Sequence, residues 1–117
     1  MKLYLDDCRE PYDNTWTLIK EPRRFMLKIV TQIDDITEIS FDHDIETYYG
    51  DKEITWYDLL DWTLLTYKNM GYPFPKITIH TANPPAWERM CSLCDYHPTL
   101  DYVYKPVAHP QWTWQWK

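Results

Sequence analysis

The chain has 117 residues, enough for one hydrophobic core and too few for two ordinary domains. Apolar residues make up 44% of the sequence and aromatic residues 17%, a composition that excludes an intrinsically disordered chain. The formal net charge of −6 excludes nonspecific nucleic-acid binding, because contact with the phosphate backbone requires clustered Lys and Arg side chains.

An apolar run at the start of the chain predicts a strand that leads into a polar loop. Residues 2–5 stop at Asp6-Asp7, and loop-forming residues follow. Residues 15–20 are rich in β-forming side chains and predict a second strand. The connection has about nine residues, fewer than the dozen or so that a parallel crossover usually needs. We therefore expect the first crossover helix to be reduced to a loop.

A helix and a third strand follow in the sequence. Pro22 suits a first helical turn, and apolar residues recur at helical spacing from there to Ile33. Residues 38–41 then form an apolar run that stops at the triplet Asp42-His43-Asp44, just as the first strand stops at two aspartates. Residues 46–53 contain Gly50 and predict a loop.

The second half of the chain repeats this alternation. A helix begins near Thr55 and ends at Gly71. Residues 76–79 predict a fourth strand, a further helix begins at Pro84, and residues 102–104 predict a fifth strand. Strands that alternate with helices favour an α/β fold with a five-stranded, mostly parallel sheet and right-handed crossovers.

The end of the chain departs from this alternation. Trp112, Trp114 and Trp116 alternate with polar residues where a last helix would be expected. We expect residues 1–107 to form the domain and residues 108–117 to form an aromatic tail packed on it.

Polar residues collect where the predicted strands end. Asp6 and Asp7 follow the first strand, Asp42 and Asp44 the third, and Lys105 the fifth. In an open parallel sheet, ligands bind beyond these carboxyl ends. Carboxylates held close together repel one another unless a cation neutralises them, and oxygen ligands suit Mg²⁺ (or Mn²⁺). We expect Asp6, Asp7, Asp42 and Asp44 to bind this ion.

Neighbouring side chains suit a phosphate and its hydrolysis. Thr81 and Lys105 are expected to hold phosphoryl oxygens, and Arg9 to grip a phosphate with its planar guanidinium. Histidine titrates near neutral pH, so His43 and His80 are candidates to exchange protons with a water or a leaving oxygen. The alternatives are a hydrogen bond from each histidine to a neighbouring carboxylate, and simple neutralisation of the acidic cluster by Arg9.

These motifs resemble the receiver domain of bacterial response regulators over residues 1–107. Leu5-Asp6-Asp7 resembles its acidic pair, Asp42 its phosphoacceptor, Thr81-Ala82 its switch hydroxyl, and Lys105 its lysine. The resemblance implies a flavodoxin-like three-layer sandwich, in which the tail replaces the last helix. It also implies Mg²⁺ ligation by Asp6 or Asp7, by Asp42 and by the backbone carbonyl of Asp44.

The sequence is more similar to a receiver-like family proposed to process cyclic phosphates. That family pairs an L-D-D-x-R start with a D-H-D centre and an H-[ST]-x-N-P turn. The matching residues here are Leu5-Asp6-Asp7-Cys8-Arg9, Asp42-His43-Asp44 and His80-Thr81-Ala82-Asn83-Pro84. Asn83 is thus a candidate phosphate contact, with a helix cap as the alternative.

The predicted function is that of a metal-dependent phosphoesterase. Its substrate would be a phosphorylated or cyclic-phosphate nucleotide or an RNA end, with Asp42, His43, His80 and Asp44 as catalytic residues. Asp44 would position a water, or Asp42 would attack phosphorus directly. The alternatives are a noncatalytic module that binds a phosphorylated nucleotide signal or a partner protein, and a phosphoacceptor receiver domain.

The three cysteines and the lack of a long apolar run bear on location. Cys8, Cys91 and Cys94 cannot all pair within one chain, which favours reduced thiols. No run approaches the roughly 20 apolar residues of a membrane helix, so we expect a cytoplasmic protein without a membrane partner. Zinc binding by Cys91, Cys94 and His97 is a lesser alternative, because a fourth ligand is not evident.

Overall fold

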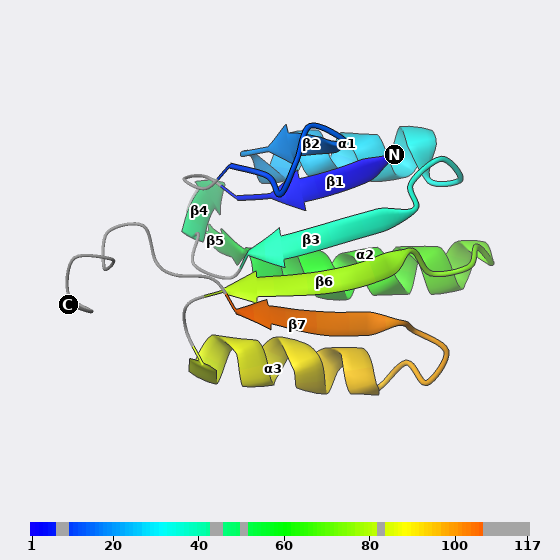
Figure 1. Ribbon diagram of the computed structural model, residues 1–117. Helices are drawn as coiled ribbons and strands as arrows, with labels where there is room; N and C mark the ends of the chain where they lie inside the picture. The colour runs from blue at the N-terminus through cyan, green and yellow to red at the C-terminus, as the bar shows by residue number, and fades with distance from the viewer. Residues whose placement is uncertain (7–9, 43–45, 50–51, 82–83, 107–117) are drawn as a thin grey trace, which may run out of the picture.

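A computed structural model describes residues 1–6, 10–42, 46–49, 52–81 and 84–106 (Figure 1). The described residues form a five-stranded sheet in the order β2-β1-β3-β6-β7, in which every neighbouring pair is parallel. The strands are β1 (Lys2–Leu5), β2 (Trp16–Ile19), β3 (Glu38–Asp42), β6 (Lys76–Thr81) and β7 (Tyr102–Pro106). This confirms the predicted parallel sheet, and the observed strand order is that of a flavodoxin-like fold.

The helices form where the sequence predicts them. In the described part of the chain they are α1 (Pro22–Gln32), α2 (Trp56–Met70) and α3 (Pro84–Asp95). Helix α1 has Pro22 in its first turn and buries Phe25 and Ile29, which lie four residues apart on one helical face. None of these helices combines the length and hydrophobicity that a membrane span requires.

The prediction of a loop over residues 46–53 was wrong. Strand β4 (Glu46–Tyr49) pairs antiparallel with β5 (Lys52–Thr55) in a separate two-stranded sheet. Both segments contain β-branched or aromatic residues, which favour extended backbone over an irregular loop. This hairpin connects the carboxyl end of β3 to α2.

The helices cover one face of the main sheet. The crossovers β2 to β3, β3 to β6 and β6 to β7 all progress in the same direction across the strand order. Right-handed crossovers with a common direction place their helices on the same face; α1 and α2 are visible behind the sheet in Figure 1. Residues from all three helices share one buried cluster with alternate strand residues such as Leu3, Ile39 and Ile77.

Among the residues that the structure describes, the opposite face carries a loop where a crossover helix would be expected. The step from β1 to β2 runs in the other direction, so a right-handed connection crosses this second face. Residues 10–15 of that connection contain no helix, as predicted. The centroid of the Tyr12 ring in this loop lies 5.1 Å from the ring centroid of Tyr4 in β1 and 5.3 Å from that of Trp16 in β2. Both pairs have edge-to-face geometry. The predicted tail at residues 108–117 lies outside the described residues.

Candidate metal and phosphate site

Strand register brings polar residues together at the carboxyl edge of the sheet. Asp42 of β3 is paired with His80 of β6, and His80 is paired with Lys105 of β7. Asp6 directly follows Leu5, which is paired with Phe41, so Asp6 emerges beside Asp42. Residues at equivalent register positions face the same side of a sheet. The structure thus brings Asp6, Asp42 and His80 together at this edge, and the roles predicted for them stay predictions.

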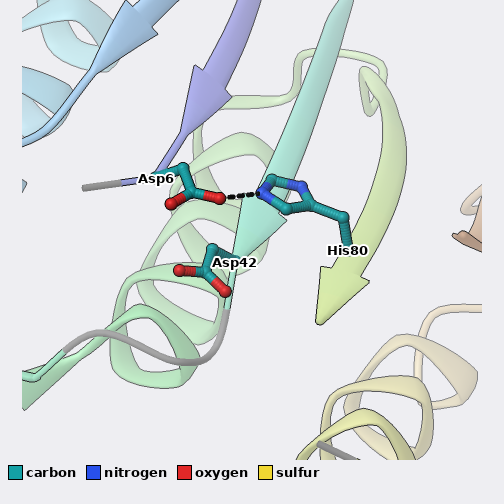
Figure 2. A group of neighbouring side chains, drawn as sticks. All are labelled: Asp6, Asp42 and His80. Atoms are coloured by element: carbon teal, nitrogen blue, oxygen red, sulfur yellow. Dashed lines mark hydrogen bonds and ion pairs between the residues drawn. The ribbon is translucent and has the colours of Figure 1, made fainter. Parts of the chain in front are cut away.

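These three residues form a buried cluster (Figure 2). Each has an exposed fraction of 0%. One potential ligand atom from each lies within 4.8 Å of the other two, and His80 Nε2 is 3.0 Å from Asp6 Oδ2. Two carboxylates this close raise the electrostatic energy of the site, and a divalent cation between them lowers it.

The donor set fits a divalent cation. Carboxylate oxygens suit Mg²⁺ and Mn²⁺, whereas imidazole nitrogen is a softer ligand that suits transition metals. A site that combines Asp6 and Asp42 with His80 therefore fits Mn²⁺ better than Mg²⁺. Among the described residues, this is the one group of three or more potential ligands with such spacing.

Side chains that the sequence motifs do not include hold His80 in place. Its Nδ1 lies 2.7 Å from Ser40 Oγ, and Ser40 Oγ lies 3.0 Å from Tyr12 Oη. The Tyr4 ring stacks on the imidazole with 4.3 Å between ring centroids and an interplanar angle of 9°. Tyr4 and Ser40 precede Asp6 and Asp42 by two residues, so the alternation of side chains along a strand was the signal that could have identified them.

The predicted phosphate ligands on β6 and β7 lie at the same edge of the sheet. Thr81 ends β6 and is paired with Pro106. Lys105 is exposed, and its Nζ lies 3.8 Å from the centroid of the Tyr12 ring, a cation–π contact. This contact holds the Lys105 charge over Tyr12, whose ring centroid lies 6.3 Å from that of His80. Phosphate binding by Thr81 and Lys105 stays a prediction.

Five predicted site residues lie outside the described residues: Asp7, Arg9, His43, Asp44 and Asn83. Their sequence neighbours Asp6, Asp42 and Thr81 are described and lie at the carboxyl edge. The roles expected for these five residues stay predictions.

The cysteines of α3 have a structural explanation. Cys94 is 1% exposed and belongs to the hydrophobic core. Burial, with smaller effects from Cys91 and Asp95, raises the pKa of the Cys94 thiol to about 12 and keeps it protonated. The His97 ring packs edge-to-face on Phe74, with 5.4 Å between the centroids. In the described part of the chain, Cys91, Cys94 and His97 do not form a group with metal-ligand spacing.

Comparison with protein families supports the strand-end motifs. The family model described as the cyclic-phosphate processing receiver domain matches residues 1–96. The match includes Asp6, Asp42 and His80 and ends before β7 and its Lys105. Searches of the curated proteins and of the solved structures found no match.

Proposed function

The chain belongs to the cyclic-phosphate processing receiver domain family, and from this premise we propose that it is a metal-dependent phosphoesterase. Its substrate would be a cyclic or linear phosphate on a nucleotide or an RNA end. The observation that carries the proposal is the buried cluster of Asp6, Asp42 and His80 at the carboxyl edge of a parallel sheet.

The acidic residues are proposed to hold Mg²⁺ or Mn²⁺. Asp6 and Asp42 supply the described carboxylates, and Asp7 and Asp44 are the further candidates from the sequence. A bound divalent cation would polarise the phosphoryl oxygens and stabilise the charge that develops on them. Arg9, Thr81, Asn83 and Lys105 are proposed to bind the phosphate, which a protein with a net charge of −6 would otherwise repel.

Hydrolysis of a cyclic phosphate requires two proton transfers. The attacking water loses a proton as its oxygen bonds to phosphorus, and the leaving oxygen gains one as the ring P–O bond breaks. His43 is a candidate group for these transfers, and His80 is the second candidate where the carboxylates alone hold the cation and its Nε2 is not a ligand. The Asp42 side chain is fully buried, so its carboxylate is not exposed to an approaching phosphorus atom. This burial favours attack by water over attack by the Asp42 carboxylate.

Replacement of Asp42 tests the proposal. Parent and Asp42→Asn proteins are incubated with Mn²⁺ and a panel of cyclic and linear nucleotides, the ion is removed with a chelator, and phosphorus NMR spectra are recorded. We expect the parent to convert at least one substrate and Asp42→Asn to be slower by about 100-fold or more, because an electrostatic group of the site is lost. Parent-like turnover by a folded Asp42→Asn protein would contradict the proposal.

Asp101→Asn is the matched control for this experiment. Asp101 is exposed and directly precedes β7, at the opposite edge of the sheet from the cluster. The control makes the same chemical change and should retain the turnover of the parent. If the parent instead binds a nucleotide and releases it unchanged, the noncatalytic binding module is supported.

A further inference from the structure

A chain of hydrogen bonds connects the loop before β2 to the buried cluster. Tyr12 Oη lies 3.0 Å from Ser40 Oγ, and Ser40 Oγ lies 2.7 Å from His80 Nδ1. His80 Nε2 in turn lies 3.0 Å from Asp6 Oδ2. All three distances are those of hydrogen bonds, and Ser40, His80 and Asp6 are each 0% exposed. Both ring nitrogens of His80 therefore face specific protein groups.

This chain can run in two directions, because a serine hydroxyl both donates and accepts. In the first direction Tyr12 donates to Ser40, Ser40 donates to His80 Nδ1, and the Nε2–H of His80 donates to Asp6. In the reverse direction the Nδ1–H of His80 donates to Ser40, and Ser40 donates to Tyr12. The imidazole is neutral in both, since the proton lost from Nε2 is matched by one gained at Nδ1.

One direction of the hydrogen-bond chain fits the site without a cation, and the other fits the site with a cation bound. Without a cation, the Asp6 carboxylate is a strong acceptor and favours the proton on Nε2. With His80 as a third ligand beside Asp6 and Asp42, Nε2 would supply a lone pair to the divalent cation and the proton would lie on Nδ1. We infer that Ser40 and Tyr12 are positioning residues that allow His80 to change tautomer while Nδ1 keeps a hydrogen-bond partner. The inference rests on the metal site of the proposed function.

The ring itself does not have to move for this change. The Tyr4 ring is stacked on the imidazole at 4.3 Å, and the Tyr12 ring meets it edge-on, with 6.3 Å between centroids and an interplanar angle of 78°. The imidazole would release its Nε2 proton to solvent as the cation binds and take up another proton from solvent at Nδ1, while the hydroxyl hydrogens of Ser40 and Tyr12 rotate so that Ser40 accepts from Nδ1. Ser40 and Tyr12 thus act on the site through His80 and need no contact with substrate.

Metal affinity and histidine NMR together test the inference. Long-range ¹H–¹⁵N spectra of the side chain, assigned with His80→Gln, should show the Nε2–H tautomer in the metal-free parent and Nδ1–H after addition of diamagnetic Zn²⁺. Ser40→Ala should weaken Mn²⁺ binding by about 10- to 100-fold, the usual effect of losing a partner of a metal ligand. Tyr12→Phe keeps the ring beneath Lys105 and should give a smaller loss in the same direction.

Thr63→Val is the matched control. Thr63 is a fully buried hydroxyl that donates to Leu59 O within α2, on the helical side of the sheet. This variant should keep the Mn²⁺ affinity and the His80 spectrum of the parent.

The outcomes separate the inference from the proposed function. If the parent binds Mn²⁺ and Ser40→Ala binds it equally well, the inference is overturned and the proposed function stands. An Nδ1–H tautomer in the metal-free parent would also overturn the inference, because no reversal would then accompany metal binding. If the parent binds neither Mn²⁺ nor Zn²⁺, the metal site itself is wrong and both proposals fail.

Discussion

At the scale of single residues, Phe25 joins one helix to a strand and to a second helix. Its side chain is 0% exposed, and its ring centroid lies 5.6 Å from that of Phe41 and 6.5 Å from that of Trp62. We expect Phe25→Ala to lower the free energy of unfolding by about 3–5 kcal/mol, because it removes these contacts and leaves a cavity. Urea denaturation followed by circular dichroism measures this loss.

Leu27→Ala on the same helix provides the comparison. Leu27 is 62% exposed, so its truncation should change the free energy of unfolding by no more than about 0.5 kcal/mol. Similar losses in the two variants would contradict the assignment of Phe25 to the core.

The site residues divide into those that a sequence motif identifies and those that it does not. Asp6 and Asp42 could be predicted, because each ends an apolar run and parallel strands end at one edge. Side-chain alternation could place Ser40 on the same face as Asp42, but its contact with His80 depends on which strands are neighbours. The position of Tyr12 depends on the path of a loop and could not be predicted. Ser40 and His80 are 40 positions apart in the sequence, and the β3–β6 register brings them together.

At the scale of elements, Tyr67 connects α2 to the end of α1. Its hydroxyl donates to the carbonyl oxygen of Ile33 at 3.1 Å, and the residue is 1% exposed. Burial, with a smaller effect from Asp34, raises the pKa of Tyr67 from 10.0 to about 12. The folded protein therefore keeps this proton up to about pH 12, whereas the unfolded chain releases it from about pH 10. This contribution to stability is full below pH 10 and is lost as the pH rises to about 12.

Tyr67→Phe tests this connection between the helices. At neutral pH we expect a loss of about 1 kcal/mol in the free energy of unfolding, because the buried Ile33 carbonyl loses its donor. Between pH 10 and 12 the variant should lose stability less steeply than the parent. Urea denaturation at several pH values gives the free energy of unfolding of both proteins as a function of pH. Parallel curves for parent and variant would show that Tyr67 does not titrate as described.

The elements themselves were largely predictable, apart from one hairpin. Apolar periodicity located the helices and the five parallel strands, because each buries a defined face. Strands β4 and β5 were missed because Gly50 was interpreted as a loop signal. Two runs of β-forming residues on either side of Gly50-Asp51 are also a hairpin signal, and the structure pairs these two runs as β4 and β5.

At the scale of the whole molecule, the direction of the crossovers explains why the two faces of the sheet differ. Three crossovers share one direction and place their helices on one face, whereas the connection from β1 to β2 has the opposite direction and is short. The sequence predicted this reduced connection from its length alone. The described part of this connection, residues 10–15, contains no helix and brings Tyr12 over Tyr4 and Ser40. It thereby supplies the outer member of the His80 hydrogen-bond chain.

A cation at the carboxyl edge should stabilise the whole fold, because its proposed ligands come from β1, β3 and β6 and the unfolded chain does not hold them together. Mn²⁺ at about 100 times its dissociation constant adds about 2.7 kcal/mol. For a domain of this size, this raises Tm by on the order of 10 °C relative to protein in a chelator. Asp42→Asn should lose most of this increase, and Asp101→Asn should keep it. Thermal unfolding followed by circular dichroism measures the effect, and an equal increase in both variants would place the ion elsewhere on the molecule.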